Sequence, residues 1–171
     1  PDDRPPDAAE SSTRLQFAIV DFDRLEGSRD LFAVDQIVCA LGTTIRKAGS
    51  QDAFRHVDVE YPLHIAQLGL KGGARHFLLV SSMGANSHSR VFYSRMKGEL
   101  EEAIRGLGYR SVTIARPSFL LGERSEFRPG EGIMKRLGFL LPRAYRPVHG
   151  RLVAAALIES ARNDLPGVRI L

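Results

Sequence analysis

Residues 74–101 read ARHFLLVSSMGANSHSRVFYSRMKGELE, and this stretch decides the fold of the chain. Its apolar run, His76–Val80, predicts a fully buried strand. The strand ends in two hydroxyl side chains, Ser81 and Ser82, and a polar loop that contains glycine follows. A strand that is apolar along its whole length is typical of a parallel sheet, because helices cover both faces of such a sheet. The stretch therefore indicates an α/β protein.

The helix expected after this loop, over about residues 89–107, carries Tyr93 and Lys97. The two side chains are four residues apart and therefore share one face of the helix. A phenol beside an ammonium, facing a strand-end hydroxyl such as Ser82, can transfer a proton to or from a carbonyl or an alcohol. The ammonium would stabilise the phenolate, and the hydroxyl would hold the substrate oxygen. By spacing alone, the pair could equally be one face of an amphipathic helix whose lysine extends to solvent.

Short apolar runs alternate with helical stretches along the rest of the chain. The expected strands, besides His76–Val80, are residues 15–20, 36–41, 111–115 and 168–171. The expected helices, besides 89–107, are a brief turn at 28–32, a helix from Ser50 as N-cap to about residue 70, one near 131–140 and one at 151–162. This alternation predicts a Rossmann-like, doubly wound parallel sheet, in which ligands bind at the carboxyl ends of the strands.

The composition bounds the class of protein. The 171 residues are 43% hydrophobic and 26% charged, which suits one globular domain or part of one. We expect residues 1–14 to be a flexible segment and residues 15–171 to be the folded domain. The single cysteine, Cys39, excludes an internal disulfide framework and fits a reducing compartment, so we expect a cytoplasmic protein. No cysteines and histidines have zinc-like spacing, so no metal is expected.

The remaining bulk properties exclude two classes of partner. No apolar stretch approaches the roughly 20 residues that span a bilayer, so no membrane span is expected. The net charge is +4, but the basic residues are spread out with no long run. A solvated basic surface is the simplest interpretation, and no nucleic-acid partner is expected.

The stretch 93–97 matches the Y-x-x-x-K signature of short-chain dehydrogenases/reductases, and its surroundings make the match more specific. Ser81 and Ser82 stand at the strand end where this family has its catalytic serine, and Arg116-Pro117 follows the next strand. The longer agreement is with the atypical branch that contains the Tat-interacting-protein-like oxidoreductases. It covers residues 38–44, 57–61, 92–99 and 116–124.

The resemblance implies roles for the matching residues. Tyr93 would be the general acid/base, and Lys97 would favour the phenolate and bind the nicotinamide ribose. Ser82 would orient the substrate carbonyl, with Ser81 as the alternative. The implied cofactor is NADP or NAD, with NADP favoured. Its other contacts would come from Asp21, Phe22, Ala40, Leu41, Gly42, Pro117 and Ser118.

Two positions qualify these assignments. Asp21 could instead cap a helix or an Asx-turn. The fourth catalytic position of the family, usually asparagine, falls near Asp58, and Pro62 four residues later has no N–H. The Asp58 carbonyl therefore lacks its helical partner and is predicted to bind water, whereas a relay role for the Asp58 side chain is not expected.

The Gly-rich, phosphate-binding turn of the family is missing from the sequence. A dinucleotide site needs such a turn between a strand and a helix, but Gly27 and Gly42 are isolated. The sequence therefore indicates a partial Rossmann-like domain that lacks the first β-α-β unit. In such a domain the strand at 15–20 has no neighbour, and the strand at 36–41 is an apolar edge.

Two functions follow from these features. The first is an NAD(P)-dependent oxidoreductase that acts on the carbonyl or alcohol group of a small molecule. The alternative is a non-catalytic Rossmann-like module for nucleotide sensing or protein interaction. A serine hydrolase fits poorly, because residues 79–85 do not form G-x-S-x-G. An apolar substrate is suggested by the expected lining, Phe119, Leu120, Phe127 and Met134, and a homodimer is left open.

Overall fold

The computed structural model describes residues 15–118, 120–121 and 147–171. Four parallel strands form one sheet in the order β1-β2-β3-β6. They are β1 (Gln36–Cys39), β2 (His76–Val80), β3 (Ser111–Ala115) and β6 (Gly167–Ile170). A separate pair of short parallel strands consists of β4 (Leu120–Leu121) and β5 (Val148–His149).

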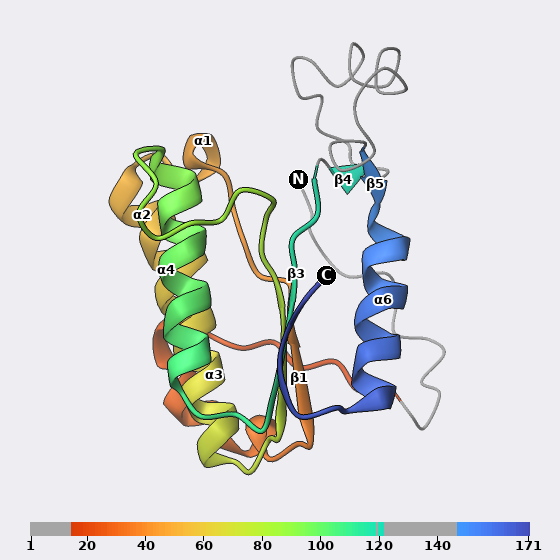
Figure 1. Ribbon diagram of the computed structural model, residues 1–171. Helices are drawn as coiled ribbons and strands as arrows, with labels where there is room; N and C mark the ends of the chain where they lie inside the picture. The colour runs from red at the N-terminus through yellow and green to blue at the C-terminus, as the bar shows by residue number, and fades with distance from the viewer. Residues whose placement is uncertain (1–14, 119, 122–146) are drawn as a thin grey trace.

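Helices cover both faces of the sheet (Figure 1), with α3 and α4 on one face and α6 on the other. The helical elements are η1 (Phe22–Phe32, 3-10), α1 (Ile45–Ala48), α2 (Gln51–Arg55), η2 (His56–Glu60, π-helical), α3 (Tyr61–Lys71), α4 (Phe92–Gly106) and α6 (Gly150–Asn163). This arrangement confirms the expected Rossmann-like α/β class. The segment 1–14 and the helix expected near 131–140 lie outside the described residues.

The two central strands bring their carboxyl ends to the same level. In the register of β2 and β3, His76 lies opposite Ser111 and Val80 opposite Ala115. All of β3 and the first four residues of β2 are buried, as expected for strands covered on both faces. Beyond the strands, the Ser81 N–H donates to the Ala115 carbonyl at 2.8 Å. The loops that follow β2 and β3 therefore leave the sheet side by side.

Close packing seats helix α4 against the loop that follows β2. The main core lies between this helix layer and the sheet, and includes Phe54, Phe77, Leu79, Met96, Leu100, Ile104 and Ile114. At Gly98 a Cβ atom would lie 2.1 Å from the Ser87 nitrogen, so only glycine lets the loop approach. The Asn86 N–H donates to the Ser94 carbonyl at 2.9 Å, which fixes the loop along the helix.

The strand expected at residues 15–20 is wrong. This segment has no regular secondary structure, and the side chains of Leu15, Phe17 and Ile19 are 57%, 71% and 98% exposed. A strand needs ladder hydrogen bonds, and no described strand lies beside this segment to supply them. The expectation that the strand at 36–41 is an apolar edge is confirmed, since β1 is an edge of the sheet and Val38 is 54% exposed.

The helix expected from Ser50 to about residue 70 is continuous but changes its pitch. The Ser50 hydroxyl accepts a hydrogen bond from the Ala53 N–H at 3.0 Å, which confirms the N-cap. Residues His56–Glu60 then widen into a π-helical segment, closed by a bond from the Tyr61 N–H to the His56 carbonyl. The next residue is Pro62, which has no N–H to donate to the Asp58 carbonyl. The irregular turn therefore falls where the sequence places a disturbed helix.

Candidate active site

Helix α4 carries three polar side chains along one face. Tyr93, Lys97 and Glu101 are successive positions four residues apart, and both charged members are buried. The Tyr93 phenol is half-buried, and its ring packs 5.7 Å from that of Phe54. The Lys97 Nζ atom lies 6.0 Å from the centroid of the Tyr93 ring, within cation–π range. The helix thus brings together the phenol and ammonium that the spacing predicted.

The Lys97 ammonium forms a buried ion pair with Asp58. Lys97 Nζ lies 2.6 Å from Asp58 Oδ1, and the side chains of Lys97 and Asp58 are 6% and 1% exposed. The lysine therefore does not extend to solvent, and the amphipathic-helix alternative is wrong on this point. The sequence predicted no relay role for the Asp58 side chain, because the family usually has asparagine at this position, and it did not predict the ion pair with Lys97. The water predicted at the Asp58 carbonyl stays a prediction.

The turn after β1 lies directly on this ion pair. The Thr43 N–H donates to Asp58 Oδ2 at 2.7 Å, so the backbone of the turn is fastened to the carboxylate. A Cβ atom at Gly42 would lie 3.1 Å from Asp58 Oδ1 and 3.7 Å from Lys97 Nζ. Glycine therefore leaves open the space above the pair.

The two strand-end serines differ in their surroundings. Ser81 is buried, and its hydroxyl donates to Glu101 Oε1 at 2.5 Å. Ser82 is half-buried, and among the described residues its hydroxyl donates to the carbonyl of the adjacent Met83, at 3.1 Å. The Ser81 hydroxyl is thus used in a buried hydrogen bond to Glu101, whereas the Ser82 hydroxyl can exchange its bond to the Met83 carbonyl for a bond to a ligand.

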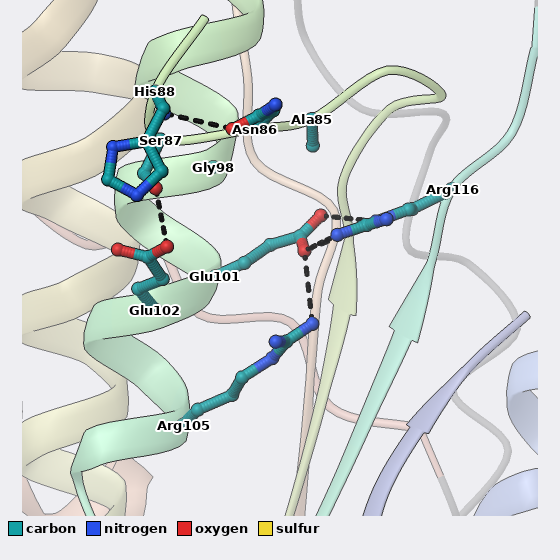
Figure 2. A pocket seen from close by; sticks show the side chains of 9 residues that line it. All are labelled: Ala85, Asn86, Ser87, His88, Gly98, Glu101, Glu102, Arg105 and Arg116. Carbon is teal, nitrogen blue, oxygen red and sulfur yellow. Dashed lines mark hydrogen bonds and ion pairs between the residues drawn. The ribbon is translucent and has the colours of Figure 1, made fainter.

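Glu101 is the second buried charge on this face of α4. Its carboxylate binds Arg116, which follows β3. Arg116 donates three hydrogen bonds, at 3.0, 3.2 and 2.5 Å, which raises the pKa of its guanidinium. Arg105 adds a weaker contact at 3.5 Å (Figure 2). The clue in the sequence was that Glu101 continues the four-residue spacing of Tyr93 and Lys97.

The structure gathers most of the other sequence-predicted contacts at the same edge of the sheet. Ala40, Leu41 and Gly42 follow β1 and lead to the Asp58–Lys97 pair. Pro117 and Ser118 follow β3, and the Pro117 carbonyl accepts a hydrogen bond from the Met83 N–H at 2.9 Å. The loops after β1, β2 and β3 therefore converge around the face of α4 that carries Tyr93.

Asp21 and Phe22 do not join this group. The Asp21 side chain caps η1 by accepting from the Asp23 N–H at 3.0 Å, which is the alternative that its residue type allowed. The Phe22 ring lies 5.3 Å from the ring of Tyr61 on α3. Within the described part of the chain, neither residue has a hydrogen bond, ion pair or ring contact with Lys97 or its partners.

A small polar pocket is lined by residues of the loop after β2, of α4 and by Arg116 (Figure 2). Its volume is about 210 Å³. Glu102, which accepts a hydrogen bond from Ser87, lines it together with Arg105 and Arg116. In the described residues, no group of three or more histidine, cysteine or acidic side chains could hold a metal ion. No helix within the described ranges is long and apolar enough to cross a membrane.

Comparison with known proteins places the chain in a family. It is 38% identical over 134 residues to protein HTATIP2 of Rattus norvegicus, covering 78% of this chain and 55% of that protein. It is 33% identical over 174 residues to the mitochondrial protein FMP52 of Candida albicans, covering 96% of this chain and 76% of that protein. The chain belongs to the HTATIP2/FMP52 family. This confirms the resemblance to Tat-interacting-protein-like members of the atypical short-chain dehydrogenases/reductases.

Solved structures share the fold of this HTATIP2/FMP52-family chain at low sequence identity. The dTDP-4-dehydrorhamnose reductase of Bacillus anthracis, in complex with NADP, has a TM-score of 0.65 and 14% identity, over 89% of this chain and 62% of that one. WbmG of Bordetella bronchiseptica, in complex with NAD, has a TM-score of 0.61 and 16% identity, over 88% and 54%. No protein-family model matches. The fold is that of NAD(P)-binding Rossmann proteins.

The relatives correct the expected location, and they are longer than this chain. The fungal FMP52 proteins are mitochondrial by name, so the expected cytoplasmic location is wrong and the relatives point to the mitochondrion. A single cysteine is equally compatible with either compartment, which is why composition misled. The chain spans little more than half of the rat protein and 59% of the fmp52 protein of Emericella nidulans.

Proposed function

We propose that the protein is an NAD(P)-dependent oxidoreductase that acts on a carbonyl or alcohol group. The observation that carries the proposal is the position of the Lys97 ammonium. It is buried beside the Tyr93 ring and beneath the open Gly42 turn, at the carboxyl edge of a parallel sheet. Ligands of such sheets bind at this edge.

The residues at this edge fit the nicotinamide end of a dinucleotide. The turn at Gly42 has the open approach that a flat ring needs, since a side chain there would fill the space above Lys97. Lys97, Gly42, Pro117 and Ser118 would hold this end of the cofactor, which supplies or takes up the hydride. No Gly-rich phosphate-binding turn occurs among the 171 residues, so they account for the nicotinamide side of the site only.

The chain's own residues handle the substrate oxygen and the proton. The Ser82 hydroxyl donates a hydrogen bond to the substrate oxygen, in place of its present bond to the Met83 carbonyl. Tyr93 donates the phenolic proton to that oxygen during reduction and takes one up during oxidation. The nearby Lys97 ammonium stabilises the phenolate that remains. The Ser81 hydroxyl is already bonded to the buried Glu101 carboxylate, so Ser82 is the better candidate to bind the substrate oxygen.

Replacement of Tyr93 by phenylalanine tests the proposal. The variant keeps the ring against Phe54 and loses only the hydroxyl. With the protein expressed from its complete coding sequence, we expect turnover of a carbonyl panel to disappear while the affinities for NADPH and NADH are retained. The same titration compares NADP with NAD, because the choice between them is part of the proposal. Full activity of Tyr93→Phe would refute the catalytic role.

One observation favours the alternative of a non-catalytic binding module. Asp58 neutralises the charge of Lys97, and this weakens the field that the ammonium exerts on the phenol. Cofactor binding without turnover of any carbonyl or alcohol in the panel would select this alternative. The apolar substrate preference stays a proposal, because most of the expected lining, Phe119, Phe127 and Met134, lies outside the described residues. A homodimer likewise stays a proposal.

A further inference from the structure

We infer that Asp58 is a positioning residue of the active site. Its carboxylate holds the Lys97 ammonium beneath the Gly42 turn and ties that turn to helix α4. The inference rests on the proposed function, because it concerns the same site. It goes further by giving the lysine a fixed acidic partner from the π-helical segment η2.

Burial of the two charges needs a reason. The side chains of Asp58 and Lys97 are 1% and 6% exposed, and removing two charges from water offsets most of their mutual attraction. Such a pair therefore contributes little to stability compared with a well-packed apolar pair. What it does supply is geometry, because the ion pair holds the Lys97 Nζ atom 2.6 Å from Asp58 Oδ1.

The second carboxylate oxygen makes Asp58 a connector. Oδ2 accepts from the Thr43 N–H at 2.7 Å, so one carboxylate binds both the lysine of α4 and the backbone after β1. The open position at Gly42 lies between these contacts, 3.1 Å from Asp58 Oδ1 for an added Cβ. A ligand that settles on the Gly42 turn would thus meet an ammonium already aimed at it.

Other groups around the lysine do not replace this partner. Cys39 of β1 is near enough for the charges of Lys97 and Asp58 to act on it, but burial raises the pKa of its thiol, which therefore stays neutral. Tyr93 presents its ring to the ammonium from the same helix. In the described part of the chain, Asp58 is the acidic side chain that ion-pairs with Lys97. Removal of its charge should leave the ammonium buried without a counter-charge.

The direct test observes the lysine itself. The ammonium of a buried, paired lysine exchanges slowly and gives a proton–nitrogen correlation signal in NMR. We would record this signal for Lys97 in the protein expressed from its complete coding sequence, and assign it with Lys97→Arg. Asp58→Asn should abolish or shift the signal. The matched control is Asp52→Asn, the same change at an exposed aspartate of α2, which should leave the signal in place.

Cofactor binding and kinetics supply a second readout. A hydrogen bond to a charged group contributes a free energy that corresponds to about 10- to 100-fold in binding. We expect Asp58→Asn to weaken NADPH or NADH binding by at least about tenfold and to lower kcat, with KM for the carbonyl substrate little changed. Asp58→Glu keeps the carboxylate, and should recover part of both the Lys97 signal and the affinity. If Asp58→Asn does not fold, Asp58→Glu still tests the positioning role of Asp58 through the Lys97 signal and the cofactor affinity.

The outcomes separate the two proposals. An unchanged Lys97 signal and unchanged cofactor affinity in Asp58→Asn would overturn the positioning role of Asp58, whatever the activity. Failure of the wild-type protein to show any Tyr93-dependent turnover would overturn the proposed oxidoreductase. The signal and the cofactor titration would in that case still decide the role of Asp58.

Discussion

Arg116 donates three hydrogen bonds to the carboxylate of Glu101, and these bonds join the end of strand β3 to helix α4. Ser81 donates to the same carboxylate from the end of β2. Each of these strand-end residues immediately precedes a predicted site residue, Ser82 or Pro117. Glu101 therefore ties the loops after β2 and β3 to the helix that carries Tyr93. These are the loops that would contact the substrate.

Loss of the Glu101 charge should destabilise the protein. In Glu101→Gln the partly buried Arg116 would lose its charge-assisted bonds, and we expect the free energy of unfolding to fall by about 2 kcal/mol. Urea denaturation followed by circular dichroism measures this change. Glu102→Gln is the matched control, because Glu102 is exposed and should change stability by no more than about 0.5 kcal/mol. Equal effects of the two variants would contradict the finding.

Two glycines of α4 should respond oppositely to alanine. At Gly98 a Cβ atom would lie 2.1 Å from the Ser87 nitrogen, so Gly98→Ala should displace the loop and cost about 1–3 kcal/mol. At Gly106 a Cβ atom would meet nothing within 4 Å, so Gly106→Ala should be neutral or stabilise the helix by up to about 1 kcal/mol. Thermal unfolding compares the pair. A stable Gly98→Ala variant would show that the loop is not seated on the helix.

The neighbouring serines should separate activity from stability. Ser82→Ala should lower kcat/KM by about 100-fold or more, through loss of the bond to the substrate oxygen, with little change in unfolding. Ser81→Ala should cost about 1 kcal/mol of stability, because Glu101 loses a buried donor. Steady-state kinetics and urea denaturation on both variants measure the contrast. The reverse pattern would assign the catalytic hydroxyl to Ser81.

Acid should destabilise the protein through His76. This histidine is fully buried, where its Nε2 lies 2.9 Å from the Thr113 hydroxyl, and burial lowers its pKa below the ordinary 6.5. The unfolded chain therefore binds a proton first as the pH falls. The stability contribution of His76 is complete above pH 6.5 and is lost as the pH falls from there through the lowered pKa.

Chemical denaturation between pH 5 and 7.5 checks this contribution. His76→Gln, which cannot take up the proton, should show a smaller loss of stability on acidification than the wild-type protein. His88→Gln, at an exposed histidine, is the control and should follow the wild-type curve. If the free energy of unfolding of His76→Gln depended on pH as steeply as that of the wild-type protein, other groups would be responsible for the acid sensitivity.

Local sequence determined the elements that carry their own signal. The strands His76–Val80 and Ser111–Ala115 have the predicted bounds, because short, mostly apolar runs between helices are typical of the strands of a parallel sheet. The Ser50 cap and the shared helix face of Tyr93 and Lys97 also follow from neighbours in the chain. The same logic failed at residues 15–20, because a strand needs a neighbouring strand and no strand among the described residues lies beside this segment.

The tertiary structure alone decided the charge partners. Asp58 and Lys97 are 39 residues apart, and only the packing of η2 against α4 brings a carboxylate to the buried ammonium. Glu101 and Arg116 are 15 residues apart, and they meet because Arg116 follows β3, which lies beside α4. Residue type and spacing determine which chemistry a helix face can offer. Which charges are buried, and against what, depends on contacts between distant segments that no local pattern records.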